Sequence, residues 1–412
     1  MRGKPVAKYT SSFKLPEGAD SSKIESSRRD FLKGATTVAA SLMVPSALRA
    51  ETSSLLPTVS LGSHRVTRLI VGSNPMYGYS HFNHLYDQHM LEWFTDERIV
   101  KLLLDCEQAG INTWQASFNY GMRNHIPKLR AAGGKIQFIC LVASWHYDEK
   151  MARTPEAILD GTIKCAQAAM EFKPIGAAFH GGATDILYRA GKIDLIKTYI
   201  DKVHDMGILA GISTHNPIIL DVLGEKGWSN DFYMAGLHYL TRHPEDWMKE
   251  IGTLPVGEGF IASDPPKMAE AVRRAEKPTL VYKVLSAGRK CGSEEEKRKA
   301  IEWAYKNIKP SDATIIGLYP RYSNQVSETT KMVREILALW PKLDSVHLPF
   351  QTPTASHLGG GNILALFLRL LKIPQKASPD LGPQGKTRVG VSENLAQFFL
   401  DHFADNRLQF FN

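Results

Sequence analysis

The chain has 412 residues, of which 43% are hydrophobic, 22% charged and 9% aromatic, a composition that excludes a disordered or fibrous protein. Its formal charge is +8, but residues 1–50 hold nine Lys or Arg and four Asp or Glu, which leaves 41 basic and 38 acidic residues in 51–412. Because basic and acidic residues are nearly equal in number there, nucleic acid is excluded as an expected partner. The four scattered cysteines predict neither a disulfide framework nor a cysteine metal site.

The amino terminus has the order of an export signal. Residues 27–33 read Ser-Arg-Arg-Asp-Phe-Leu-Lys and precede a mildly apolar run at 34–44. This order is typical of a twin-arginine (Tat) signal peptide. We therefore expect residues 1–50 to be a signal, the Tat translocase to be a partner during export, and the mature bacterial protein to be periplasmic or extracellular. No later stretch has the roughly 20 apolar residues of a transmembrane anchor.

From residue 60 to 345, short β-branched stretches alternate with amphipathic ones. The stretches predicted as strands are 67–73, 112–117, 135–144, 175–180, 208–215, 232–239, 279–285 and 314–319. The helices predicted between or after them are 97–109, 155–172, 193–206, 266–275, 294–308 and 327–340. Eight strands without a G-x-G-x-x-G after the first predict an α/β fold, a closed (β/α)8 TIM barrel rather than an open sheet.

The pattern changes after residue 345. Residues 346–412 are rich in proline and glycine and end in an amphipathic stretch at 392–404. We interpret them as an extension of the barrel domain. We expect the terminal helix to pack on the barrel or on a second subunit of a homo-oligomer.

Barrel chemistry lies at the carboxyl ends of the strands. The polar residues predicted there include Asn74, Gln115, Tyr120, His146, His180, His215, His238 and Lys283. This set is rich in histidine, and Glu258 is its one evident acid. Metal-dependent sugar isomerases and glycosidases need at least two central acids, so both classes are disfavoured.

Two groups within this set have alternative interpretations. His180, His215 and His238 would bind a transition metal if they converged, or each is a separate structural or substrate-contacting residue. Lys283 lies in an apolar strand. It either pairs with an acid such as Glu258 or, when desolvated, forms a Schiff base with a carbonyl substrate.

Several motifs, in order, resemble those of the aldo/keto reductase superfamily. They are the segments 69–74, 110–121, 210–213, 285–289 and 315–317, together with His180. The resemblance implies a barrel that reduces carbonyl groups with NADP. It implies that Tyr120 and His180 are catalytic and that the NADP-binding residues are Ser213, Gly317, Arg321, Gln325 and Glu328.

The chain departs from that family at two catalytic positions. The family's aspartate and lysine, which lower the pKa of the catalytic tyrosine, are replaced by Gln115 and Val142. A phenol without a cationic neighbour is a weak acid catalyst near neutral pH. Either Lys283 takes over the role of the lysine, or His180 and His215 carry out proton transfer.

Aromatic and histidine residues in 74–84 and 145–147 indicate a sugar-like ligand. The expected substrate contacts are Asn74, Gln115, His146 and His238. We therefore expect an exported aldo/keto reductase-like oxidoreductase that acts on a carbonyl or sugar-like substrate with tightly held NADP. The alternatives are a cofactor-independent or metal-dependent sugar lyase, isomerase or hydrolase, and a non-catalytic carbohydrate-binding protein.

Overall fold

The structure is a computed structural model that describes residues 54–150, 152 and 154–344, with the side chains of residues 120 and 340–344 excepted. The predicted signal at 1–50 and the predicted extension at 346–412 lie outside the described residues. Within the described part, no helix is both long and apolar enough to cross a membrane.

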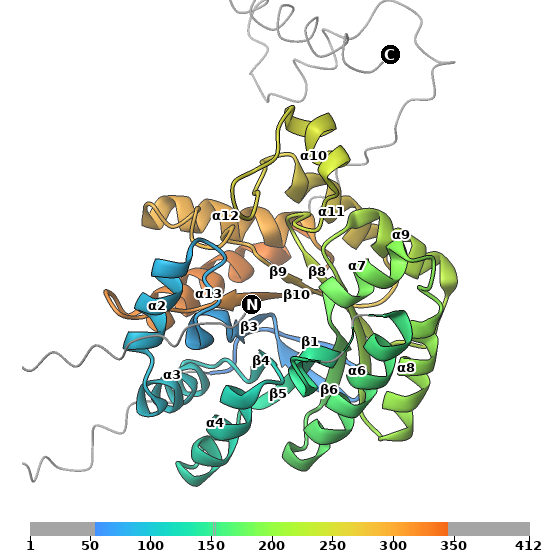
Figure 1. Ribbon diagram of the computed structural model, residues 1–412. Coiled ribbons are helices and arrows are strands. Elements are labelled where there is room, and N and C mark those ends of the chain that lie inside the picture. The colour runs from blue at the N-terminus through green and yellow to red at the C-terminus, as the bar shows by residue number, and fades with distance from the viewer. Residues whose placement is uncertain (1–53, 151, 153, 345–412) are drawn as a thin grey trace, which may run out of the picture. The chain divides into compact units, whose positions relative to one another are not determined.

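Eight parallel strands close into a barrel, which confirms the predicted fold (Figure 1). They are β3 (Leu69–Gly72), β4 (Thr113–Ser117), β5 (Gln137–Val142), β6 (Gly176–Phe179), β7 (Leu209–Thr214), β8 (Phe232–Gly236), β9 (Thr279–Tyr282) and β10 (Ala313–Gly317). Each strand pairs with its neighbour along the chain, and β10 pairs with β3 to complete the ring. All eight strands lie within one or two residues of a predicted stretch or inside it.

Alternate residues of each strand face the barrel interior. Ile139 and Ala178 belong to the interior cluster, whereas their neighbours Cys140 and Ala177 pack against the helices. This two-residue period follows from the pleat of the strand. It determines which residues at the strand ends reach the mouth of the barrel.

A hairpin at the amino-terminal side was not predicted. It consists of β1 (Thr58–Leu61) and β2 (His64–Thr67), and its buried residues join the interior cluster. The carbonyl of Arg65 accepts hydrogen bonds from Asn112 at 2.8 Å and from Gln137 at 2.7 Å. Both donors lie at the amino-terminal ends of their strands, so the hairpin covers this end of the barrel.

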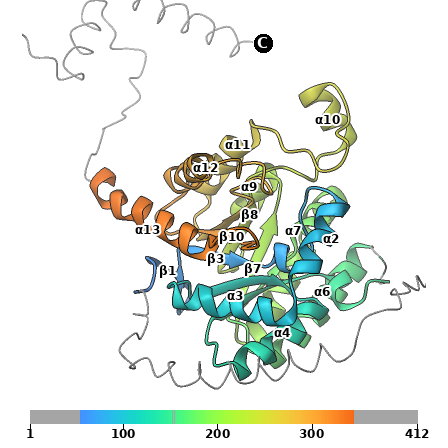
Figure 2. The ribbon, with the colours of Figure 1, turned by 90° about the vertical axis from the view of Figure 1, so that its left-hand side faces the viewer.

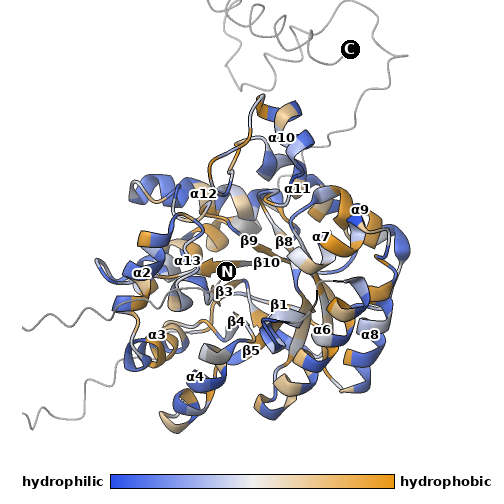
Figure 3. Cartoon of the chain, viewed as in Figure 1, coloured by the Kyte–Doolittle hydropathy of each residue, from blue (hydrophilic) through white to orange (hydrophobic). Residues whose placement is uncertain are grey.

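Helices surround the barrel, and Figure 3 shows both hydrophilic and hydrophobic stretches on them, as expected for amphipathic helices. The helices that match predicted stretches are α3 (Asp96–Gln108), α6 (Pro155–Ala169) with the 3-10 turn η2 (Met170–Phe172), α8 (Leu195–Asp205), α11 (Asp264–Arg274), α12 (Glu294–Asn307) and α13 (Gln325–Asp344). Caps define their starts: Thr154 caps α6, whose first residue is a proline.

The remaining helical elements were not predicted from the sequence. They are η1 (Asn74–Tyr77), α2 (His84–Trp93), α4 (Tyr120–Ala131), α5 (Ser144–Tyr147), α7 (Gly181–Arg189), α9 (Pro217–Lys226) and α10 (Pro244–Ile251). Figure 2 shows α10 on a segment that projects from the barrel. Several of these elements follow strands directly, and they position the side chains of the site.

Candidate functional site

Two cavities open at the carboxyl ends of the strands. The axial cavity, of about 840 Å³, is lined from β4, β5, β7, β8 and β9, and the side cavity, of about 660 Å³, lies between η1, α2, β9 and β10. Both volumes are in the range of small-molecule sites. The residues that line both cavities are Asn74, Tyr79, His81, Gln115, Tyr282 and Lys283. The cavities therefore meet near the barrel axis.

A carboxylate–histidine pair lies in the wall of the axial cavity. His215 follows β7, and its Nδ1 lies 3.3 Å from Oδ2 of Asp185 on α7. Asp185 is 1% exposed and also accepts hydrogen bonds of 2.6 Å from the hydroxyls of Thr214 and Thr241. A carboxylate at Nδ1 keeps the proton on that nitrogen, so Nε2 is left as the basic nitrogen.

Two glycines leave the space that the His215 ring occupies. A Cβ on Gly181 would lie 2.9 Å from its Cε1, and a Cβ on Gly236 would lie 3.1 Å from its Cδ2. The Tyr282 ring packs edge-on against the imidazole at 5.6 Å. The orientation of His215 is thus determined by a buried acid and by close packing.

His180 has the opposite arrangement of donor and acceptor. It caps α7, and its Nδ1 accepts the backbone N–H of Gly182 at 3.0 Å. The neutral ring therefore carries its proton on Nε2. Burial, together with the nearby His146, His215 and Lys283, lowers the pKa of His180 well below its usual value. A neutral N–H donor suits a substrate hydroxyl or carbonyl oxygen.

His146 lies beside His180, with ring centroids 5.4 Å apart. Its Nδ1 donates to the carbonyl of Leu141 at 3.2 Å, which leaves Nε2 as an acceptor. Burial lowers the pKa of His146 to about 4. The axial cavity is therefore lined by three imidazoles, each with one ring nitrogen assigned as donor and the other as acceptor: those of His146, His180 and His215.

Lys283 lies where the two cavities meet. It follows the last residue of β9 and has a φ of 61°, in the left-handed region. Burial lowers the pKa of the Lys283 amine to about 8, and Glu258 offsets part of this effect. Among the described residues the amine has no hydrogen bond or ion pair, so the predicted pairing with Glu258 is replaced by a longer-range attraction.

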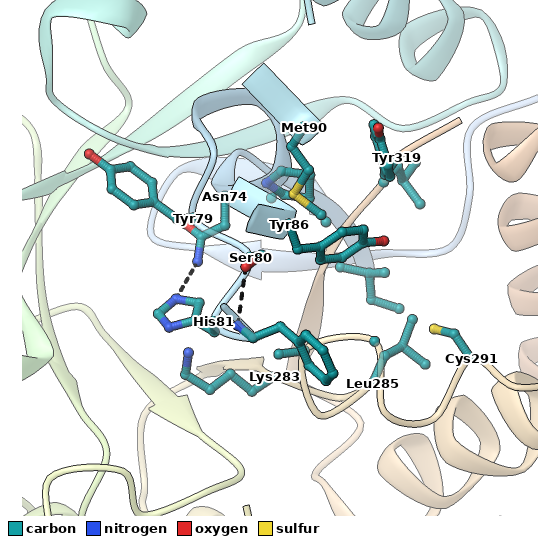
Figure 4. A pocket seen from close by; sticks show the side chains of 18 of the residues that line it. Asn74, Tyr79, Ser80, His81, Tyr86, Met90, Lys283, Leu285, Cys291 and Tyr319 are labelled. Atoms are coloured by element: carbon teal, nitrogen blue, oxygen red, sulfur yellow. Dashed lines mark hydrogen bonds between the residues drawn. The ribbon is translucent and has the colours of Figure 1, made fainter. Parts of the chain in front are cut away.

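Glu258 instead pairs with His81, a residue with a φ of 55°. The His81 Nδ1 lies 2.7 Å from the carboxylate, and its Nε2 lies 3.0 Å from the Asn74 amide nitrogen. Figure 4 shows the Asn74–His81 bond and the Lys283 side chain reaching towards the same ring. Burial lowers the pKa of His81, and Glu258 offsets only part of this effect. These residues form a hydrogen-bonded chain, Glu258–His81–Asn74, between the cavities.

The loop that carries His81 is also held by the segment that follows β9. Arg289, which follows β9, donates to the His81 carbonyl at 3.2 Å. Its guanidinium lies 4.1 Å from the Phe260 ring centroid and 5.0 Å from that of Phe82. These contacts hold the loop after η1 next to the β8 and β9 loops.

The structure divides the predicted cofactor-binding residues. Gly317 and Gln325 line the side cavity, and Ser213 lines the axial cavity, where its hydroxyl lies 3.1 Å from that of Tyr282. Arg321 and Glu328 line neither cavity. Arg321 contacts the Tyr319 hydroxyl, and Glu328 bonds Ser323 at 3.0 Å. Their roles in cofactor binding stay predictions.

The predicted catalytic and substrate-binding residues are also divided. Asn74, Gln115, His146, His180, His215 and Lys283 come together around the axial cavity. His238 does not line it, because its Nε2 bonds the Ser286 hydroxyl at 2.8 Å and its ring packs on Phe260. Tyr120 begins α4, but its side chain lies outside the described part of the structure.

The replaced lysine position needs a correction. Val142 is buried against the surrounding helices, and its neighbour Leu141 is the β5 residue that lines the axial cavity. The pleat of β5 explains the shift by one residue. Gln115 and Leu141 are both uncharged, so no ion pair of the family's type is present at these two positions.

The three histidines 180, 215 and 238 do not converge, because His238 is directed at Ser286. In the described part of the chain there is no group of three or more His, Cys, Asp or Glu residues placed to hold a metal ion.

Sequence reasoning missed Asp185 and the pairing of His81 with Glu258. Asp185 is the middle residue of α7, a helix that was not predicted, and it meets a histidine 30 positions away. Its position five residues after His180, at the mouth end of α7, was the available signal. For His81, the available signal was the histidine-rich segment 74–84 itself.

No protein-family model matches the sequence, and no curated protein matches it. Solved structures that resemble the fold include a glycerol dehydrogenase, AKR11B4, from Gluconobacter oxydans, 14% identical, with a TM-score of 0.41 over 68% of this chain and 95% of that one. The apo form of Gox0644 is 11% identical, with a TM-score of 0.40 over 69% and 94%. QR15, an aldolase, is 10% identical, with a TM-score of 0.34 over 60% and 92%. At such values these likenesses carry no conclusion about family or activity.

Proposed function

We propose that this protein is an aldo/keto reductase-like oxidoreductase that interconverts a hydroxyl and a carbonyl group of a sugar-like substrate, with NADP in the side cavity. The observation that carries the proposal is that two cavities of ligand size meet at one wall of titratable and polar side chains. A redox reaction of this class needs a substrate and a dinucleotide in contact, and two joined cavities supply that arrangement.

The residues of the side cavity are compatible with a dinucleotide. Gly72 and Gly317 end their strands there without side chains, and the aromatic rings of Tyr86 and Tyr319 offer flat apolar surfaces. After β9, the backbone has positive φ values at 286, 287 and 288, and the N–H groups of Ala287 and Gly288, which line the side cavity, would suit phosphate oxygens. Bound NADP would supply the hydride acceptor or donor.

The axial cavity holds the acid–base groups. In the direction of oxidation, the Nε2 of His215 accepts the hydroxyl proton of the substrate, and Asp185 stabilises the resulting imidazolium. The Nε2–H of His180 donates a hydrogen bond to the same substrate oxygen. This arrangement takes over the proton transfer that the family assigns to a tyrosine paired with lysine.

The first experiment measures the cofactor. The full chain is produced with its own signal, purified, denatured and assayed for released NADP by fluorescence and mass spectrometry. We expect stoichiometric NADP, or saturable binding of added NADPH. A protein that neither carries nor binds the dinucleotide would refute the oxidoreductase proposal.

The second experiment tests His215 with a matched control. His204 also pairs with an acid, Asp231, at 2.9 Å, but it lies outside both cavities. We expect His215→Asn to abolish NADP-dependent turnover of a polyol and sugar panel while NADP binding persists. His204→Asn should leave turnover unchanged.

A second candidate function is a cofactor-independent lyase or isomerase acting on a keto-sugar. The observation that favours it is the unpaired Lys283 amine with a pKa of about 8, because an amine that is neutral near that pH attacks carbonyl groups. Borohydride reduction in the presence of a keto-sugar would trap an adduct on Lys283. A Lys283→Met variant should then give none.

The proposal includes export through the Tat pathway to the periplasm or beyond. Its support is the Ser-Arg-Arg-Asp-Phe-Leu-Lys sequence at 27–33. Replacing Arg28 and Arg29 by lysine should retain the precursor in the cytoplasm of a bacterial host. Export of that variant at the normal level would contradict the proposed route.

A further inference from the structure

We infer that the axial cavity binds a carboxylate group of its substrate through the guanidinium of Arg123, and that sugar acids, not neutral sugars, are therefore the substrate class. The inference deepens the proposed function and rests on it for the reaction at the other end of the substrate. The assignment of the anion site rests on Arg123 alone.

Arg123 lies in the first turn of α4, which follows β4 and is capped by Asn119. It lines the axial cavity. Its Nε and Nη2 atoms are both buried, and neither has a hydrogen-bond partner within the described part of the chain. The contact recorded for the guanidinium is with the face of Phe118, 4.5 Å from its ring centroid.

Other arginines that contact the body of the protein have acceptors. Arg242 forms a buried ion pair with Asp264, and Arg68 donates to the carbonyl of Asp312 at 3.1 Å. Arg130 donates to two carbonyls at 2.8 Å. Arg123 thus differs from these in having nitrogens enclosed by protein without any acceptor.

The described part of the protein supplies no hydrogen-bond acceptor to these two nitrogens of the guanidinium. A guanidinium does not lose its proton in proteins, and a buried charged donor without an acceptor destabilises the fold. The ring of Phe118 offers attraction to the charge but no lone pair. An anion that enters the axial cavity would supply the missing acceptors.

The charges around the cavity favour a carboxylate. Lys283 is a second cation without an ion pair. Of the two acids that line the cavity, Glu258 is engaged by His81 and Glu149 is exposed. One planar guanidinium matches the two oxygens of a carboxylate in a bidentate pair, and because it would bind a phosphate in the same way, the test below includes a phosphorylated sugar.

The geometry also gives the substrate an orientation. Arg123 follows β4, whereas His215 follows β7, so the two approach the cavity from different sides of the barrel. A sugar acid with its carboxylate at Arg123 would present a hydroxyl to His215 and His180. Neutral sugars would leave the guanidinium unpaired.

The test compares matched sugars in the absence of NADP, so that its result does not depend on turnover. D-glucuronate and D-galacturonate are paired with D-glucose and D-galactose, and glucose 6-phosphate is included. Binding is measured by titration calorimetry and by the shift in melting temperature. The proteins are the full-length wild type, Arg123→Met, Arg123→Lys and a control, Arg273→Met, whose arginine is exposed and lines neither cavity.

We expect at least one uronate to bind wild type and Arg273→Met at least tenfold more tightly than its neutral partner. Arg123→Met should lose this preference, and Arg123→Lys should keep part of it. Arg123→Met without ligand should melt no lower than wild type, which shows that the loss is not unfolding.

Three results would overturn the inference: no uronate preference in wild type, an undiminished preference in Arg123→Met, or a preference for the phosphorylated sugar over both uronates. Each can occur whether or not the protein carries NADP. The inference and the proposed oxidoreductase function can therefore fail separately.

Discussion

The replacement Asp185→Asn tests the acid–base assignment most directly. The Asp185 carboxylate accepts two hydroxyl hydrogen bonds of 2.6 Å, from Thr214 and Thr241, and faces the Nδ1 of His215 at 3.3 Å. Asparagine has almost the same shape but only one acceptor oxygen. If that oxygen stays with Thr214, the amide N–H₂ group faces the Nδ1–H of His215, and donor meets donor.

Both stability and catalysis should change. A hydrogen bond to a charged group contributes about 1.5–3 kcal/mol, so the loss of one or two of them at a site that is 1% exposed predicts a decrease of about 1.5–6 kcal/mol in the free energy of unfolding. The His215 ring should shift its proton to Nε2 and lose its role as a base. Correctly placed acid–base groups contribute about 10²–10⁴ in rate, and turnover should fall by that range.

Three assays separate these effects. Denaturant unfolding measures stability, a polyol and sugar panel with NADP measures turnover, and ¹⁵N NMR of the histidine rings reports the His215 tautomer without any substrate. Asp221→Asn is the control, because Asp221 pairs with Arg274 on the surface. A wild-type spectrum with the proton on Nε2, or an Asp185→Asn variant with full turnover, would refute the reasoning.

Three further predictions concern the barrel and its buried bases. Gly211→Ala places a Cβ 2.3 Å from the buried Phe232 ring and should lower the free energy of unfolding, measured in denaturant titrations, by about 1–3 kcal/mol. The control Gly224→Ala should not lower it, because a Cβ at that position has no other atom within 4 Å. Burial depresses the pKa of Lys283 to about 8, so between pH 8 and the usual pKa of lysine the unfolded chain binds more protons than the folded one. The melting temperature of wild type should therefore rise with pH in this range relative to that of Lys283→Met. Parallel plots of melting temperature against pH for the two proteins would contradict this. Likewise, a His146 pKa of about 4 means that the protein loses on the order of 3 kcal/mol of stability as pH falls from about 6.5 towards 4. His146→Gln should reduce this loss of stability at acid pH. An unchanged loss in the variant would argue against the low pKa.

The barrel was predictable because its signals are local. A strand such as β7 shows its two-residue period and its bounding turns within eight residues of sequence, and the stop at Gly207 precedes it directly. The placement of His180 and His215 at the mouth followed from the fold rule that strand ends carry the site. These conclusions need no knowledge of which side chains touch.

The neighbours of those residues were not predictable. Asp185 reaches His215 across 30 positions, and His81 reaches Glu258 across 177, so neither contact leaves a mark in a local pattern. Whether Leu141 or Val142 faces the cavity depends on where the pleat of β5 begins, which one residue of register decides. His238 was expected at the mouth, and packing against Phe260 and Ser286 placed it elsewhere.

The sequence by itself thus determined a (β/α)8 barrel with histidines at its mouth, since periodicity and turn residues act over short distances. Only the tertiary structure decided which imidazole has an acid behind it, which lysine is unpaired and which arginine lacks an acceptor. Those properties depend on packing between segments far apart in the chain, where the loss of water makes each hydrogen bond or missing partner matter.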